Sequence, residues 1–597
     1  MRLPALALAC TLACTLRLGS NSQATFVVGP QGAVIGVAGG LSLHLPAGAL
    51  PQGTQITVTQ SDGPIDALSP QATFDPALAL AVPAAVSFAV DSDSAALYWN
   101  GETILASISA GIATAQVSRL GSGYFRRPPP GRTVSGRLVT IYQPDSGASA
   151  TLGGALGLRM HVTALWVPGS TGYSRMPVVS APDYSFSVPN VPQGQYFLEI
   201  DTLYKEADYG AQLFAFTTST PDLSMIAAAR PDVQIATHSP QVTLDISNLL
   251  PWVYPSGAYT GDLLMVAGSQ ANAFGRPHSV RPAAAATTWH GTFDWNLMAT
   301  STTPAGLPDV SKGDVEFIYQ RATRALGGGV AHRAARYQRL DTLTLTDGTA
   351  ASLSVALADA PQTGSLHVDV RGTQWAALAK QVNPAAGFTD VASGGVSILA
   401  VPHSLDFPNL PYASAATSVL WVQVPDGLDV NYGDVSYGQF LGPEWKELRY
   451  PAYFFESPDR TLGGEIFTMD AMPETSPIVP RLSPPRAPLV NGRDAFVAQT
   501  GVGTQPTLSW SPPSLGTATS YLVSIWRQPA AAGFKSLQMT VHGATSVAVP
   551  PGFLEAGAQY SGTIVANSAP WDVPDVPAFR TGLPLAYAEC ALGTFSP

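Results

Sequence analysis

Two stretches near the N-terminus, Leu41-Ser42-Leu43-His44-Leu45 and Thr54-Gln55-Ile56-Thr57-Val58-Thr59, place an apolar side chain on every second residue. This alternation is typical of a half-buried β-strand, because successive side chains of a strand point to opposite faces of the sheet. The segment between them, Pro46-Ala47-Gly48-Ala49-Leu50-Pro51, has the composition of a turn. Similar runs between Gly and Pro breaks recur along the chain. The sequence therefore predicts an all-β fold of tandem β-sandwich domains with a larger β-rich middle region.

The length and the charge content limit the classes of protein to consider. A chain of 597 residues is long enough for about three to five domains. Charged residues make up only 12%, about half of the roughly 25% typical of soluble domains. The net charge of −11 is spread along the chain without a block of like charges. We therefore expect no nucleic-acid partner.

The N-terminus has the pattern of a secretory signal. Met1 and Arg2 precede 14 uncharged residues from Leu3 to Leu16, and Ser22-Gln23-Ala24 offers small residues to a signal peptidase. The apolar run is shorter than the roughly 20 residues that span a membrane. We expect residues 1–24 to be a signal peptide and the chain to be exported, to an extracellular, periplasmic or outer-surface location.

The cysteines allow one alternative to a soluble exported chain. Cys10 and Cys14 lie in the leader, so a mature chain would keep Cys590 alone and would form no intrachain disulfide. Cys14 is a candidate for lipidation, as the first residue of a lipoprotein, although Thr11 stands where an aliphatic residue is favoured. A lipid there would be the only membrane attachment. For Cys590 we expect a buried, unreactive position in a late strand.

The first module begins after the leader and covers residues 25–125. Gly39-Gly40, the alternating strand that follows, the Pro46–Pro51 turn and the Thr54–Thr59 strand together resemble the ZU-five domain of ankyrins, netrin receptors and bacterial surface proteins. Val117–Phe125 resembles the last strand of that family. The resemblance implies a β-sandwich that serves as a spacer or interaction module and carries no catalytic residues.

A proline-rich linker and a second module follow. Arg126-Arg127-Pro128-Pro129-Pro130-Gly131 favours an extended linker, taken as residues 126–133. The opening Val134-Ser135-Gly136 and the later Tyr184–Leu198 segment resemble the transthyretin-like module that accompanies carboxypeptidases and bacterial surface proteins, over residues 134–204. In that module Gly194 permits a tight turn and Tyr196 points into the core.

Residues 205–480 form a β-rich region with no family resemblance. Either two sandwiches or one large sheet assembly fits its length, and the sequence does not choose between them. Asp347-Gly348 is a hairpin signal between two strand-like runs. Two short stretches, Met225–Ala229 and Gln374–Val382, have helical character. The expected strands lie at Val242–Ile246, Val315–Tyr319, Leu343–Leu345, Leu353–Val355, Leu366–Val370 and Val419–Val422.

The C-terminal region, residues 484–597, resembles a fibronectin type III domain. The resemblance rests on Thr507–Pro513 with Trp510, on Ser520–Trp526, and on Leu554–Ala566, in which Leu554 and Tyr560 are six residues apart. It implies that Trp510 packs from an early strand and that the Tyr560 phenol bonds back to the backbone.

No catalytic, cofactor or metal-ligand motif is found in the sequence. None of the nine His forms a helical zinc pair, and His278 and His290 are better interpreted as ordinary surface or core residues. The sequence lacks a G-x-S-x-G elbow, a phosphate loop and a dinucleotide-binding motif, so we expect no cofactor. Gly327-Gly328-Gly329 is interpreted as a turn between two strands.

Acidic and aromatic residues are weaker candidates for calcium binding, glycoside hydrolysis or sugar stacking. Asp91-Ser92-Asp93-Ser94 and the set Asp309, Asp314 and Glu316 come nearest to a calcium site, but we favour solvated loop carboxylates for both. Paired acids for glycoside hydrolysis are not locatable from sequence. Exposed tryptophans would stack on sugars, although core positions are the favoured interpretation for the six of the middle region, which are Trp252, Trp289, Trp295, Trp375, Trp421 and Trp445.

The sequence thus favours a non-catalytic exported protein that acts as a scaffold and interaction module toward an unknown protein or glycan. The alternative is a secreted hydrolase or carbohydrate-binding protein whose active part lies in 205–480. A cleft in which two or more Asp, Glu or His side chains converge would favour the alternative.

Overall fold

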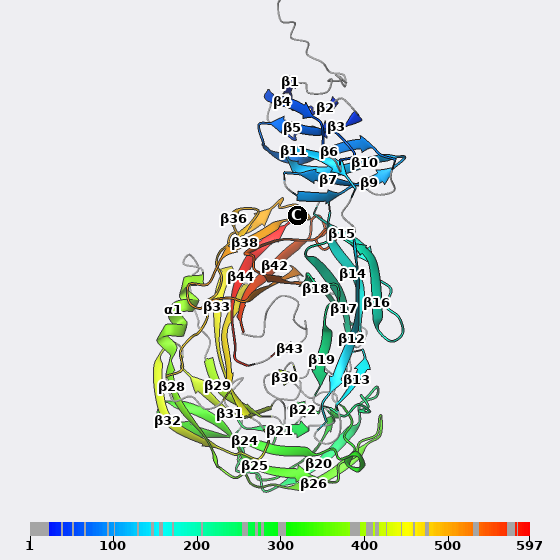
Figure 1. The fold of residues 1–597 in the computed structure, drawn as a ribbon. Coiled ribbons are helices and arrows are strands. Elements are labelled where there is room, and N and C mark those ends of the chain that lie inside the picture. Colours follow the sequence, from blue (N-terminus) through cyan, green and yellow to red (C-terminus); the bar gives the residue numbers. More distant parts are fainter. Residues whose placement is uncertain are drawn as a thin grey trace, which may run out of the picture. The chain divides into compact units, whose positions relative to one another are not determined.

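The computed structural model has 61% strand and 3% helix, which confirms the predicted all-β fold (Figure 1). The leader, including Cys14, lies outside the described residues. The structure describes residues 23–597 except 37–39, 51–52, 65–66, 92–94, 101, 128–130, 145–148, 155–158, 170–171, 205–206, 228, 254–260, 269–270, 272, 276, 278–279, 296–305, 383–393, 401–409, 412–416, 426, 443, 458–459, 472–476, 529–535, 570–579 and 582.

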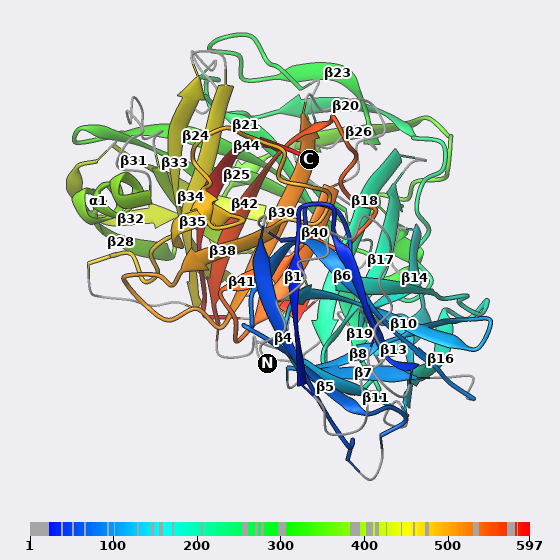
Figure 2. The same cartoon turned by 90° about the horizontal axis from the view of Figure 1, so that it is seen from above.

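The chain divides into two compact units, and the first consists mainly of residues 1–134. Its described strands form two sheets, which are drawn in blue in Figure 2. One sheet has the order β1 (Gln23–Val28), β4 (Thr54–Ser61), β5 (Gln71–Asp75), β11 (Ser122–Arg126), β7 (Ala96–Trp99) and β8 (Glu102–Leu105). The other has the order β2 (Ala33–Gly36), β3 (Ser42–Leu45), β6 (Ala79–Ala89), β10 (Ile112–Arg119) and β9 (Ser107–Ser109).

The alternation that predicted strands decides which side chains form the core of this unit. Leu43 and Leu45 on β3 are buried while His44 between them is exposed. Ile56 and Val58 on β4 are fully buried as well. Burying a side chain of this size contributes about 1.5–3 kcal/mol, so the two strands hold the sheets together. The expected last strand, Val117–Phe125, is divided between β10 and β11.

The linker region joins β11, which ends at Arg126, to β12 (Arg132–Tyr142), while Pro128–Pro130 lie outside the described residues. The two features expected of the second module are present. Gly194 has a φ of +102°, which only glycine adopts readily, and Tyr196 is buried with the Arg132 guanidinium 5.5 Å from its ring centre. The partners of β12 are β13 (Ala150–Gly153), β16 (Ser185–Val191) and β19 (Leu223–Ala227).

One of the two helix predictions is wrong. Met225–Ala229 was predicted to be helical, but Met225 lies in β19, which pairs in parallel with β12 from Leu138↔Leu223 to Tyr142↔Ala227. A five-residue helix leaves most of its backbone groups unpaired, whereas the neighbouring strand satisfies them. The second prediction, Gln374–Val382, is confirmed by α1 (Gly372–Val382), where Trp375 is fully buried.

The second unit contains one continuous sheet that includes strands of the middle region. Its strands pair in the order β21 (Leu263–Gly268), β24 (Glu316–Leu326), β25 (Gly329–Leu340), β31 (Thr417–Val424), β29 (Gly394–Ala400), β33 (Glu444–Ser457) and β34 (Arg460–Ala471). The triple glycine forms the predicted turn, because Leu326 pairs with Gly329.

The same sheet continues past residue 480, where a domain boundary was expected. It runs on through β44 (Leu585–Ser596), β42 (Gln559–Ser568), β39 (Ser520–Gln528), β40 (Ser536–His542) and, in parallel, β18 (Ala207–Phe216). Figure 2 labels β33, β34, β44 and β42 along this stretch of the sheet. Main-chain pairing therefore joins residues 207–471 to the C-terminal region.

A smaller sheet covers part of the middle region and consists of β23 (Trp289–Asp294), β20 (Gln241–Ser247) and β26 (Ala351–Ala356). Its apolar side chains, such as Leu244, share a core with Val266 on β21 and Ile318 on β24. The expected hairpin around Asp347-Gly348 is wrong: the turn forms, but β26 pairs in parallel with β20. The Asp347 carboxylate instead accepts hydrogen bonds from Thr237 and His238.

The C-terminal strands of the continuous sheet face a second sheet made of β36 (Arg493–Asp494), β35 (Arg486–Val490), β38 (Thr507–Ser511) and β41 (Ser546–Ala548). Trp510 on β38 is buried and meets Tyr521 of β39 edge-on, with 5.0 Å between ring centres. This contact ties the two sheets together. It places Trp510 on the early strand, as the resemblance implied.

Beside α1, β28 (Gly364–Arg371) pairs with β32 (Asp429–Tyr437). In the described part of the chain no helix is both long enough and apolar enough to cross a membrane. The remaining described strands are β14 (Arg159–Gly169), β15 (Gly172–Pro177), β17 (Tyr196–Tyr204), β22 (Phe274–Gly275), β27 (Ala358–Asp359), β30 (Leu410–Pro411), β37 (Gln499–Thr500) and β43 (Arg580–Thr581).

Candidate functional site

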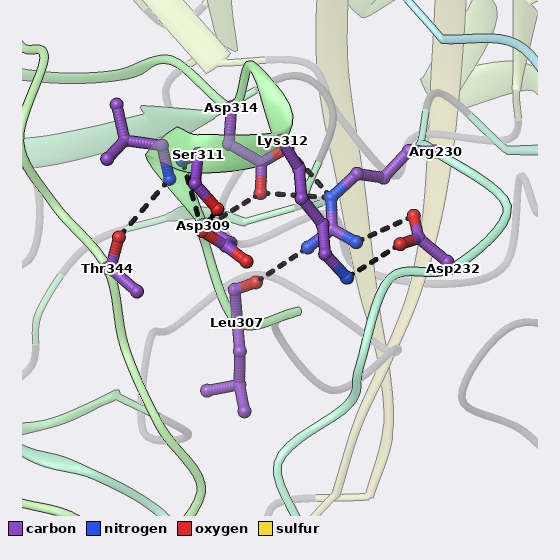
Figure 3. A network of polar contacts seen from close by, with 9 residues as sticks. Arg230, Asp232, Leu307, Asp309, Ser311, Lys312, Asp314 and Thr344 are labelled. Atoms are coloured by element: carbon purple, nitrogen blue, oxygen red, sulfur yellow. Dashed lines mark hydrogen bonds and ion pairs between the residues drawn. The ribbon is translucent and has the colours of Figure 1, made fainter.

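Two residues of the weak calcium candidate, Asp309 and Asp314, belong to a network of polar contacts around Arg230 (Figure 3). Arg230 and Asp314 are both buried, and the Arg230 Nε lies 3.0 Å from Asp314 Oδ1 and 3.2 Å from Oδ2. Asp314 Oδ2 also accepts a 2.7 Å bond from the backbone N–H of Asp309. The guanidinium donates a further bond to the Leu307 carbonyl. Charge and hydrogen-bonding capacity are thus satisfied within the protein.

The outer side of the same network is exposed. Asp232 lies between two cations, 2.8 Å from Arg230 and 2.6 Å from the Lys312 ammonium. Hydrogen bonds from Lys312 and Arg230 lower the pKa of Asp232 to about 2. Asp309 caps the short helix Val310–Lys312 by accepting bonds from the Ser311 N–H and hydroxyl, which lowers its pKa.

These contacts argue against a calcium site. Asp314 binds Arg230, and no group of three or more His, Cys, Asp or Glu within the described ranges is arranged to hold a metal ion. The favoured alternative, solvated loop carboxylates, is wrong for Asp314 and Glu316, which are 2% and 1% exposed. The other candidate, Asp91-Ser92-Asp93-Ser94, lies outside the described residues except for Asp91.

Glu316 is a buried acid of the same region. Neither of its carboxyl oxygens receives a hydrogen bond from any described residue. Burial, with a smaller contribution from the charge of Asp314, raises the pKa of Glu316 well above its ordinary value. The carboxyl group occupies the space beside Gly268, where any larger side chain would overlap it. Burial therefore favours the protonated form of Glu316.

A second pair of acids lies where the middle region meets the C-terminal strands. Ile466 on β34 pairs with Ala588 on β44, so Glu465 and Glu589 are the next opposed positions of the two antiparallel strands. The Tyr587 hydroxyl donates a 2.7 Å hydrogen bond to Glu465 Oε2. Burial, and then the charge of Glu465, raise the pKa of Glu589 to about 7. Glu589 therefore titrates near neutrality beside Glu465.

An aromatic pair lies next to these acids on the same face of the sheet. Phe467 and Tyr587 are directly opposed across β34 and β44, and their rings stack with 4.5 Å between centres. A proton donor beside a carboxylate is the minimal arrangement for general acid–base chemistry, and an aromatic face binds apolar sugar surfaces. No sequence pattern pointed to this cluster, because Tyr587 and Glu465 are 122 positions apart.

The residues singled out from the sequence are distributed elsewhere. Of the five middle-region tryptophans whose side chains are described, Trp252, Trp295 and Trp375 are buried, whereas Trp289 and Trp421 are partly buried. The side chain of Trp445 lies outside the description, as does His278. His290 is exposed on β23. The tryptophans described therefore serve mainly as core residues, which is the interpretation that the sequence favoured.

Cys590 occupies the position expected for it. It is fully buried on β44, and burial raises the pKa of its thiol. A thiol that stays protonated is a poor nucleophile. Cys590 is therefore a packing residue of the continuous sheet.

The comparisons with known proteins add no family to this description. No protein-family model and no curated protein matches the chain.

Proposed function

We propose that this chain is a non-catalytic exported protein that acts as a scaffold and interaction module at the cell surface or in the periplasm. The observation that supports the proposal is the continuity of main-chain pairing. Pairing of β34 with β44, and of β40 with β18, links the middle region to the C-terminal strands. A sheet that extends over so many residues is stiff, and its connecting loops are available for recognition.

The leader and the surface composition support the location and the partner class. Residues 1–24 carry the pattern of a signal peptide, and only 12% of the chain is charged. A weakly charged surface favours recognition through hydrogen bonds and apolar contacts, which suits a protein or glycan partner. A lipid on Cys14 would hold the same scaffold at a membrane.

The test uses the full chain exported from its own leader. Mass spectrometry of the mature N-terminus distinguishes cleavage near Thr25 from lipidation at Cys14. Surface cross-linking and glycan-array binding then identify the partner. The mass of the recovered partner is measured by mass spectrometry to show whether it has been chemically changed. We expect saturable binding with a chemically unchanged partner. A partner that is hydrolysed on incubation contradicts the proposal.

A second candidate function, glycan binding or hydrolysis, is favoured by one specific observation. Glu465 and Glu589 face each other beside the stacked Phe467–Tyr587 pair. A carboxyl group with a raised pKa beside a second acid is typical of glycosidase sites. If this candidate is correct, Glu465→Gln and Glu589→Gln each abolish turnover of a glycan that the wild type cleaves. Unchanged turnover in both variants excludes the pair as the catalytic acids.

A further inference from the structure

Two arginines lie at diagonal positions on the hairpin formed by β24 and β25. Arg333 on β25 is opposed to Ala322 on β24, and Arg324 on β24 is opposed to Ala331 on β25. Residues two apart on a strand point to the same face of the sheet, so both arginine side chains leave the same face of the hairpin. Diagonal neighbours of this kind are about 7–8 Å apart, within reach of long side chains. The hairpin therefore brings two guanidinium groups together.

No acid neutralises this pair within the part of the chain that the structure describes. Burial, and then the charge of Arg324, lower the pKa of Arg333, and no carboxylate opposes these two causes. Asp434, an acid on β32, is bonded to His367 at 2.8 Å instead. By contrast, Arg339 further along β25 pairs with its own aspartate at 2.7 Å. The two guanidinium groups on the hairpin thus repel each other, and an anion between them would relieve that repulsion.

Hydroxyl groups of β32 lie over the same face. Arg333 Nη1 donates a 2.9 Å hydrogen bond to Ser436 Oγ, which leaves the hydroxyl proton of Ser436 available to a ligand. The Tyr432 hydroxyl occupies the space beside Gly329, where any larger side chain would overlap it. Gly329 is four residues before Arg333 on β25, so this hydroxyl lies on the arginine face. The Tyr432 oxygen is buried and has no hydrogen-bond partner among the described residues.

The strand next to β25 gives this face an apolar floor. Leu420 and Val422 on β31 oppose Arg333 and Ala331, and both are fully buried. Arg333 is partly buried, whereas Arg324 is exposed. An ion held beside apolar side chains is less screened by water, so its attraction to the guanidinium groups is stronger than on an open polar surface. Arg324 leaves one side of the pair open to solvent.

We propose that this face binds a tetrahedral oxyanion of the sulfate and phosphate class. The guanidinium groups of Arg324 and Arg333 hold two of its oxygens, and the hydroxyls of Ser436 and Tyr432 donate to it from β32. A carboxylate has two oxygens, which the two guanidinium groups would occupy by themselves. Donors from two arginines and two hydroxyls match the larger number of acceptors on a tetrahedral ion.

Equilibrium dialysis of the full chain against radiolabelled inorganic sulfate, and separately against inorganic phosphate, tests this proposal. Sodium chloride holds the ionic strength constant, so that general screening is the same at every concentration of the probe. We expect saturable binding of one ion per chain. Uptake that rises in proportion to the free ion without saturation, for both probes, overturns the proposal.

Variants connect the bound ion to the hairpin. Arg324→Gln and Arg333→Gln are each expected to weaken binding by about tenfold or more, because each removes charge-assisted hydrogen bonds. Tyr432→Phe removes one neutral donor and should weaken binding by a smaller factor. Arg339→Gln is the matched control on the same strand, since the Arg339 guanidinium is already paired, at 2.7 Å, and its side chain is 55% exposed.

The control should bind the ion as the wild type does. Arg324 is exposed, so Arg324→Gln is expected to fold, and urea unfolding of each variant verifies this. Wild-type affinity in both Arg324→Gln and Arg333→Gln rejects the site. An equal loss of affinity in Arg339→Gln also rejects it, because the ion would then respond to the overall charge of the chain.

Discussion

The phenol oxygen of Tyr560 accepts a 2.8 Å hydrogen bond from the backbone N–H of Glu555. Tyr560 is buried at the start of β42, and Leu554, next to Glu555, is buried as well. The bond fixes the loop that leads into β42, which pairs with both β39 and β44. A single side chain therefore anchors the connection into the C-terminal end of the continuous sheet.

Removing this phenol is expected to destabilise the second unit. Tyr560→Phe leaves the Glu555 N–H without its acceptor, which costs about 1–3 kcal/mol, measured by urea unfolding. Tyr432→Phe is the control, because the Tyr432 hydroxyl has no hydrogen-bond partner among the described residues. That variant should be neutral. Equal effects of the two substitutions would mean that the Tyr560 bond contributes nothing.

Arg230 gives a comparison between a buried and an exposed ion pair on one guanidinium. Arg230→Met leaves the buried Asp314 carboxylate without its partner and is expected to cost about 3–5 kcal/mol. Asp232→Asn removes only the exposed partner, whose side chain is 60% exposed, and should cost less than about 1 kcal/mol. Thermal unfolding of both variants measures the difference. Similar losses would contradict the assignment of Asp314 as the structural partner.

The pH dependence of stability should report on Glu589. Its folded-state pKa of about 7 lies above the unfolded value of about 4.3. Between these values the folded chain keeps a proton that the unfolded chain has lost. Unfolding free energy therefore decreases as pH rises through this window, by at most about 1.4 kcal/mol per pH unit from this group.

Two substitutions separate the causes of that shift. Glu589→Gln should remove the pH-dependent contribution and stabilise the chain above neutral pH. Glu465→Gln removes the neighbouring charge but leaves the burial, which is the larger cause, so part of the dependence should remain. Denaturant unfolding between pH 5 and 8 checks both. If Glu589→Gln leaves the decrease of unfolding free energy with pH unchanged, the titrating proton belongs to another group.

Glu316 offers a stabilising substitution. Its buried carboxyl lacks partners among the described residues, so Glu316→Met, of similar shape, is expected to raise the unfolding free energy by about 1–3 kcal/mol at neutral pH. Gly268→Ala is the opposing variant and should destabilise, because its methyl group overlaps the Glu316 carboxyl. A loss of stability in Glu316→Met would reveal an unrecognised partner of this acid.

The predicted strands of the middle region were largely correct where alternation was strong. Val242–Ile246 lies in β20 and Leu366–Val370 lies in β28, because period-two burial is a local property of the chain. Short segments were less predictable. Leu343–Leu345 forms only an isolated bridge, between Thr344 and Asp309, and Met225–Ala227 became a strand through its neighbour β12.

The sequence by itself determined that this protein is built from sheets, since the alternation of apolar residues sets which face of each strand is buried. It also determined the fixed points of turns and corners, such as Gly194, Gly328 and Tyr560, because backbone conformation and local bonding act over a few residues. Tertiary structure alone decided which strands are neighbours. Pairing of β34 with β44 opposes Glu465 to Glu589, and Arg230 reaches Asp314 across 84 positions. Such contacts depend on the register between distant strands and loops, and no local pattern encodes them.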